Sequence, residues 1–116
     1  MSFKLSHTFY ERKSEFQNIV SKYPHKFPII CEKSTSSSND CPDIDKNKYL
    51  VSNELTIGQF LYIIRKRLKI TPEKALYIFI NGIIPATSDY ICNIYHHYKD
   101  EDGFLYITYT TENTFG

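Results

Sequence analysis

The feature of this sequence that most restricts its fold is an amphipathic helix that begins at Thr56 and lies between short, strand-like apolar runs. Thr56 and Gln59 have the spacing of a capping box, and Leu55 and Phe60 have that of a hydrophobic staple. One face of the following segment is apolar, and basic residues at its end complement the helix dipole. We therefore expect a helix over 56–68 that needs a partner surface for the face formed by Ile57, Phe60, Leu61, Ile64 and Leu68.

Four apolar runs around this helix have the composition and length of β-strands. They are Phe27–Cys31, Lys48–Val51, Ala75–Ile80 and Phe104–Thr110. Pro28 indicates a strand start or an edge position in the first run. The dipeptide Asn81-Gly82 predicts a tight turn after the third run. The last run alternates in a way that supplies apolar side chains to both faces, so we expect it inside the sheet.

Helical segments are also expected on either side of this pattern. Ser14 and Gln17 fit a capping box for a helix that ends before Pro24, and a shorter helical piece is predicted over Thr8–Lys13. Ser88 is the expected cap of a short helix near the C-terminus. The order predicts an α+β protein with a ubiquitin-like β-grasp fold, a four-stranded mixed sheet and an N-terminal helical extension. We divide it into a helical subregion (1–24) and a β-grasp core with a flexible C-terminal tail (25–116).

Composition argues against several classes of protein. The 116 residues suffice for one domain. The three cysteines are odd in number and lack C-x-x-C spacing, so we expect a reducing compartment and no zinc site or disulfide framework. The chain shows no N-terminal apolar segment typical of secretion and no run long enough to span a membrane. We find no metal-ligand spacing among the histidines and no base paired with a cysteine, so we expect no metal, no cofactor and no catalytic site.

Charge is distributed unevenly along the chain. Residues 1–74 hold 13 of the 14 Lys and Arg but 8 of the 13 Asp and Glu, whereas the formal net charge of the whole chain is +1. A basic first part and an acidic second part favour a protein-binding surface of mixed sign over a nucleic-acid footprint. We therefore expect protein partners and no nucleic acid.

The sequence ends in Gly116, after a polar stretch that shows no core pattern. A carboxylate on a residue without a side chain is an unhindered acyl group, because an approaching nucleophile meets no Cβ. A terminal glycine alone is weak evidence, but it becomes informative because a predicted β-grasp domain precedes it.

Several segments, in the same order, resemble the autophagy ubiquitin-like modifiers of the GABARAP type over essentially the whole chain. The resemblance rests on Lys22-Tyr23-Pro24, Pro28–Lys33, Asp43–Val51, Leu55–Phe60, Ile64–Arg67, Ala75–Asn81, Pro85–Ser88, Ile94-Tyr95 and Glu101–Ile107. Departures from the family pattern include Ser52 in place of proline, Gly82 in place of a larger residue, and a longer, serine-rich loop at 34–43.

The resemblance implies a modifier and not an enzyme. Family members are activated at a C-terminal glycine by activating and conjugating enzymes of the ubiquitin-like type and joined to phosphatidylethanolamine; Gly116 is the matching residue. A cysteine protease trims and releases them, and the sequence leaves open whether Gly116 is an encoded or a trimmed end. The resemblance also implies a location in the cytoplasm and on autophagosome-type membranes. The residues themselves leave two rivals, an unconjugated β-grasp adaptor and, less favoured, a small enzyme.

The second implied function is the binding of receptors and adaptors that carry an aromatic-x-x-aliphatic motif. Such a peptide would add as a strand to the edge at 48–51. The positions that match the aromatic pocket are Glu15, Ile19, Pro28, Ile30, Lys48, Leu50 and Phe104. Those that match the aliphatic pocket are Tyr49, Val51, Leu55, Phe60 and Ile63. Lys46 and Arg67 form a charged flank for acidic residues of the motif.

Overall fold

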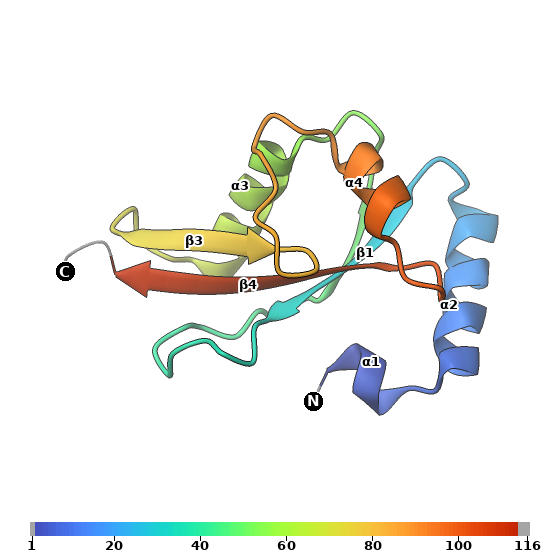
Figure 1. Ribbon diagram of the computed structural model, residues 1–116, viewed down its shortest axis with the longest axis horizontal. Coiled ribbons are helices and arrows are strands. Elements are labelled where there is room, and N and C mark those ends of the chain that lie inside the picture. The colour runs from blue at the N-terminus through green and yellow to red at the C-terminus, as the bar shows by residue number, and fades with distance from the viewer. Residues whose placement is uncertain (1, 114–116) are drawn as a thin grey trace.

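A four-stranded mixed sheet forms the centre of the molecule (Figure 1). The computed structural model describes residues 2–113, so Gly116 lies outside the described residues. The strands lie in the order β2-β1-β4-β3, with β4 parallel to β1 and the other neighbours antiparallel. Their bounds are β1 (Phe27–Lys33), β2 (Lys48–Val51), β3 (Lys74–Phe79) and β4 (Leu105–Asn113). The predicted mixed sheet, with its last strand inside, is confirmed.

Helix α3 (Ile57–Leu68) forms as its sequence predicts. Thr56 Oγ1 accepts a hydrogen bond from the Gln59 N–H at 3.2 Å, and Gln59 Oε1 accepts one from the Thr56 N–H at 2.9 Å. Lys69 ends the helix in a left-handed conformation. The side chains that the helix buries are Ile57, Phe60, Ile64 and Leu68.

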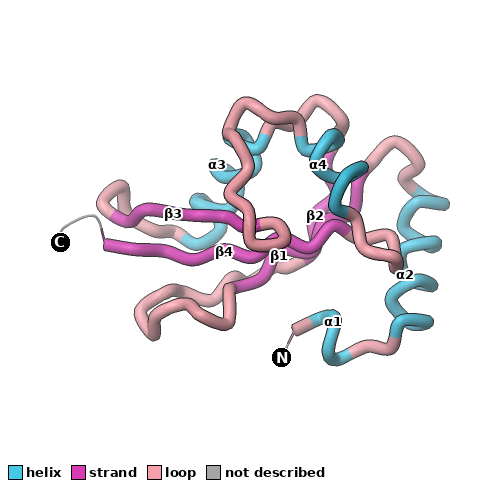
Figure 2. Tube along the Cα trace, in the orientation of Figure 1, coloured by secondary structure: helices cyan, strands magenta, loops and turns pink. Residues whose placement is uncertain are grey.

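The two faces of the sheet carry two apolar clusters. Helices α3 and α4 (Ile91–Tyr98) cover one face, where the main core receives Leu105, Ile107 and Tyr109 from β4. A smaller cluster contains Phe3, Ile30 and Phe104, with Phe16, Ile19 and Tyr106 packed against it. Figure 2 shows helices α1 (Phe3–Ser6) and α2 (Phe9–Lys22) apart from the α3–α4 layer, near the end of the sheet where β4 begins. Within residues 2–113, no helix combines the length and the apolar character needed to cross a membrane.

The cap of the N-terminal helix differs from the prediction. The capping box is formed by Thr8 and Glu11, and not by Ser14 and Gln17, which lie inside α2. Both pairs fit the sequence pattern, but His7 is extended and interrupts the helix just before Thr8. Helices α1 and α2 are therefore separate, and the predicted piece at 8–13 is the first part of α2.

Two further predictions at the C-terminal end need correction. Ser88 does not cap α4: the N-cap residue is Tyr90, and the Ile91 N–H donates to the Leu55 carbonyl at 2.9 Å. Strand β4 continues through Asn113 instead of ending at Thr110, because β3 pairs with it from Thr108 to Asn113. Part of the stretch expected to be a loose tail is thus in the sheet.

Two glycines occupy backbone conformations that require them. Asn81 and Gly82 both have positive φ (51° and 77°) and form the predicted tight turn, which the Ile80–Ile83 bridge closes. Gly103 has φ +102°. A Cβ at this position would lie 2.5 Å from two ring carbons of Phe16 on α2. The close approach of α2 to the loop before β4 therefore depends on glycine.

Candidate functional site

Strand β2 is an edge of the sheet, since among the described strands it pairs with β1 alone. Its side chains alternate: Tyr49 and Val51 are buried, whereas Leu50 is 40% exposed. Its outer side can accept another strand through backbone hydrogen bonds. The predicted edge position is confirmed.

A hollow of about 330 Å³ lies beside this edge. Helix α2, strands β1 and β2, and the residue before β4 all contribute to it. Five residues expected in the aromatic pocket line it together with one expected in the charged flank: Ile19, Pro28, Lys48, Leu50 and Phe104, with Lys46. Ile29 and Tyr49 complete the lining. Ile30 is fully buried beneath it, in the cluster that contains Phe3 and Phe104.

Two lysines at the rim of this hollow contact residues of α1, α2 and β2. Lys48 Nζ lies 2.8 Å from Glu15 Oε1, which brings the last member of the predicted aromatic set to the rim. The same ammonium group lies 4.8 Å from the centre of the Phe3 ring. Lys46 Nζ lies 5.2 Å from the Tyr49 ring centre. The site thus presents Lys46, and Lys48 paired with Glu15, over apolar walls. Phe3 is a supporting residue that the sequence did not indicate.

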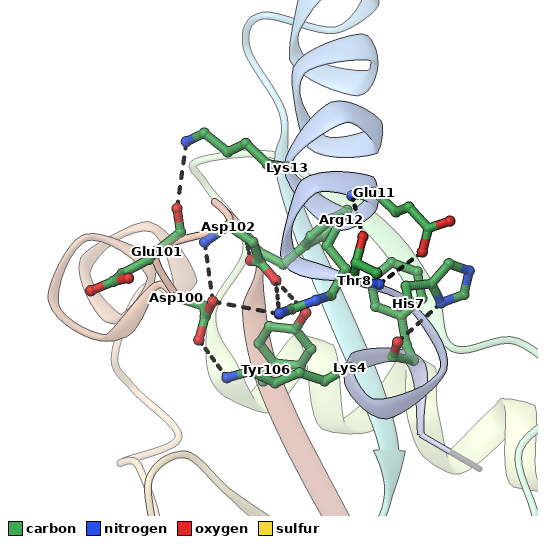
Figure 3. Close-up of polar contacts among 12 residues, drawn as sticks. Lys4, His7, Thr8, Glu11, Arg12, Lys13, Asp100, Glu101, Asp102 and Tyr106 are labelled. Carbon is green, nitrogen blue, oxygen red and sulfur yellow. Dashed lines mark hydrogen bonds and ion pairs between the residues drawn. The ribbon is translucent and has the colours of Figure 1, made fainter.

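A buried polar network fixes the backbone at Phe104. Asp102 is fully buried, and its Oδ1 accepts the Phe104 N–H at 2.8 Å. Its Oδ2 accepts from Arg12 at 2.7 Å and from the Tyr106 hydroxyl at 2.5 Å (Figure 3). Burial raises the pKa of Tyr106, and the hydrogen bond to Asp102 adds to the shift. The pairing escaped sequence reasoning because 90 residues separate Arg12 from Asp102.

The residues expected to form the aliphatic pocket are divided in the structure. Tyr49, Val51 and Phe60 are buried in the main core, with the Tyr49 and Phe60 rings packed edge to face at 5.7 Å. Leu55 and Ile63 instead line an open hollow of about 720 Å³ along α3. The other residues of that hollow are Thr56, Gly58, Gln59, Tyr62, Thr87 and Ser88. Three residues of this set therefore lie in the core beneath the surface, whereas Leu55 and Ile63 are accessible to a ligand.

Three other groups considered in the sequence are Arg67, the possible metal ligands and the cysteines. Arg67 Nε lies 3.1 Å from Asp45 Oδ1, so this predicted flank residue is already paired. No group of three or more His, Cys, Asp or Glu within residues 2–113 is arranged to hold a metal ion. Cys31 is buried in β1, and burial raises the pKa of its thiol.

The chain matches a known protein family and known individual proteins. Residues 11–116 match the family described as "Autophagy protein Atg8 ubiquitin like". The chain is 53% identical over 115 residues to Autophagy-related protein 8 of Mycosarcoma maydis, covering 99% of this chain and 96% of that protein. It is 55% identical over 114 residues to the protein of the same name from Schizosaccharomyces pombe, covering 98% and 93%.

A solved structure shows the same fold. The crystal structure of Trypanosoma brucei ATG8 superposes with a TM-score of 0.89 at 42% identity, covering 100% of this chain and 98% of that one. The ubiquitin-like fold and the family are therefore established by both sequence and structure. This chain belongs to the Atg8 family of ubiquitin-like autophagy modifiers.

Proposed function

We propose that this protein is conjugated through Gly116 to phosphatidylethanolamine and then recruits proteins that carry an aromatic-x-x-aliphatic motif to autophagosomal membranes. The observation that carries the proposal is the cation-rimmed hollow beside the open edge of β2. The family match, which extends to residue 116, supports the role of the terminal glycine. The partners are activating and conjugating enzymes, a cysteine protease that trims or releases the protein, and motif-bearing receptors.

Lipid attachment would hold this domain on a membrane through a covalent bond. One acyl chain gives weak, reversible binding at about 0.8 kcal/mol per buried CH₂, whereas two chains anchor a protein stably. A diacyl phospholipid supplies both chains through one amide bond. The protein would then exist as a free cytoplasmic form and a membrane form that hydrolysis of this bond can reverse.

Peptide binding would use the edge and both hollows. The peptide adds to β2 as a strand, its aromatic side chain enters the hollow lined by Ile19, Leu50 and Phe104, and its aliphatic side chain lies toward Leu55 and Ile63. Burying two apolar side chains contributes roughly 1.5–3 kcal/mol each. Because association itself is costly, we expect micromolar affinity, which multiple contacts on a membrane would strengthen.

The conjugation proposal is tested by reconstitution. The protein is incubated with the activating and conjugating enzymes of a relative, ATP and vesicles that contain phosphatidylethanolamine. Mass spectrometry should detect the lipid on Gly116, and the Gly116→Ala variant should carry none. If the relative is lipidated under the same conditions and this protein is not, conjugation is rejected. Retained peptide binding would then favour the unconjugated adaptor.

The peptide-binding proposal is tested by calorimetry with an aromatic-x-x-aliphatic peptide that carries acidic flanking residues. Leu50→Ala should weaken binding about tenfold, because it removes part of the hollow wall. Leu5→Ala is the matched control, since Leu5 is 81% exposed and lies outside both hollows. Equal affinity in the two variants would reject the proposed edge. Tyr49→Ala is unsuitable, because this ring also packs in the core.

A further inference from the structure

The serine-rich loop between β1 and β2 is bound by lysines of the inner strand β1 and the edge strand β3. Lys74, the first residue of β3, donates to the backbone carbonyl of Asp40 and to its Oδ2, each at 3.3 Å. Lys33 donates to the Cys41 carbonyl at 3.2 Å and pairs with Asp43 at 2.7 Å. In Figure 1 this loop extends toward the same end of the molecule as the end of β4. The loop is therefore held by specific polar contacts and covers part of the sheet.

Ser38 contributes to the set of hydrogen bonds that joins Asp40 to Lys74, which we call the Asp40 fastening. Its hydroxyl donates to Asp40 Oδ1, while the other oxygen of that carboxylate faces Lys74. The hydrogen bond from Ser38, and then that from Lys74, lowers the pKa of Asp40. The Ser38 carbonyl also accepts the Cys41 N–H at 3.1 Å. Cys41 is 2% exposed although its neighbour Asp40 is exposed, so the fastened loop keeps this thiol buried.

We propose that Ser38 is a phosphorylation site for an acid-directed serine/threonine protein kinase, and that the phosphate releases the Asp40 fastening and uncovers Cys41. ATP is the donor: the bond between its γ-phosphorus and the ADP oxygen breaks, and a bond forms between that phosphorus and Ser38 Oγ. The hydroxyl proton passes to the kinase's general base. Asp40 and Asp43, which follow the serine, are exposed carboxylates for a basic substrate groove.

The structure favours Ser38 over the other serines of the loop. Ser37 has Asp40 three residues after it, but it is half-buried and donates to the Tyr109 carbonyl at 3.4 Å. The Ser34 and Ser36 hydroxyls lie 3.0 Å apart and interact with each other. Ser38 is exposed, and its hydroxyl is bonded to the exposed side chain of Asp40 rather than to a strand of the sheet. A kinase can therefore reach its hydroxyl without breaking a contact to β4.

The charges around Asp40 determine the direction of the effect. A phosphoserine carries a charge of about −1.5 to −2 and would stand at the position where the neutral hydroxyl now donates to Asp40. Lys74 is 19% exposed and close enough to serve either anion, whereas Lys33 is already engaged by Asp43. A phosphate makes stronger charge-assisted hydrogen bonds, so it takes Lys74 and repels Asp40. Asp40 then loses its hydrogen bonds from Lys74 on β3, and the hydrogen bond from Lys33 to the Cys41 carbonyl remains.

The site itself is tested with folded protein, ATP and a recombinant serine/threonine protein kinase that prefers an acidic residue two positions after the serine, where Asp40 stands relative to Ser38. Mass spectrometry should place one phosphate on Ser38. Ser38→Ala should lose it, whereas the matched control Ser36→Ala should keep it. Absence of phosphate, or phosphate confined to Ser37, would overturn the assignment.

The consequence is tested by alkylation of Cys41 with iodoacetamide, because the other two free cysteines, Cys31 and Cys92, serve as internal references. Protein made with phosphoserine at position 38 should modify Cys41 about tenfold faster than the unmodified protein. Lys74→Gln, which opens the same fastening, should act in the same direction, and phosphoserine at position 36 should not. Half-buried Cys92 should react at an unchanged rate, and Cys31 should stay protected. An unchanged or slower rate at Cys41, or faster reaction of all three cysteines together, would refute local release.

Discussion

Replacing Gly103 with alanine should destabilise the protein for two separable reasons. The residue has φ +102°, a conformation that residues with a Cβ rarely adopt. The added Cβ would also lie 2.5 Å from Cδ1 and Cδ2 of Phe16 and still closer to Cγ. Phe16 packs edge to face against Phe104, with 6.0 Å between ring centres. The substitution therefore strains the backbone and pushes a ring that supports the candidate site.

The expected loss can be estimated from these two contributions. A non-glycine residue in a disfavoured backbone conformation costs about 1–3 kcal/mol. Forcing extra atoms into packed surroundings costs about 1–3 kcal/mol more. Phe16 is half-buried, so its ring can move partly toward solvent, which favours the lower part of the second range. We expect Gly103→Ala to lower the free energy of unfolding by about 2–4 kcal/mol.

A double-mutant cycle measured by urea unfolding separates the two contributions. Gly103→Ala, Phe16→Ala and the double variant are compared with the parent protein. Phe16→Ala removes the ring, so in that background Gly103→Ala should retain the backbone cost alone, and the coupling should be about 1–2 kcal/mol. Equal cost of Gly103→Ala in both backgrounds would refute the steric argument. A total cost below about 0.5 kcal/mol would refute the backbone argument as well.

Three further results are expected. Arg12→Met should lower the free energy of unfolding by about 3–5 kcal/mol in urea unfolding, because the fully buried Asp102 loses its cation; a loss below about 1 kcal/mol would contradict this role. Partial burial raises the pKa of the Asp100 carboxyl, but the hydrogen bonds from Lys4 and the Asp102 N–H, together with the charges of Lys4 and Arg12, lower it by more, so the pKa lies below its ordinary value of 3.8. The Asp100 carboxylate therefore stabilises the fold above about pH 4, and this stabilisation is lost as pH falls through the lowered pKa. Asp100→Asn should make the free energy of unfolding less dependent on pH in the acid range. Burial raises the pKa of Tyr49 from 10.0 to about 12. The neutral Tyr49 hydroxyl therefore contributes fully to the stability of the fold below pH 10, and this contribution is lost as pH rises to about 12. Tyr49→Phe should make the free energy of unfolding fall less steeply in this alkaline range, and an identical slope in the two proteins would contradict this.

Much of the fold could be predicted because its signals are local. The capping box at Thr56, the apolar face of α3 and the Asn81-Gly82 turn each depend on residues within one or two helical turns or a few positions. Alternation in the last strand indicated its place inside the sheet. The same local reasoning failed at Ser14, because two capping patterns occur in one helical stretch and the break at His7 decides between them.

The pattern of residues along the chain is enough to predict the order of elements, the edge strand and most of the residues beside it. The roles of those residues depend on how the elements pack in three dimensions. It buried Tyr49, Val51 and Phe60 while leaving Leu55 and Ile63 accessible, and it joined residues as distant as Arg12 and Asp102. The physical reason is that periodicity records which face of an element is apolar, whereas the depth of each side chain and its long-range polar partner depend on how the elements pack.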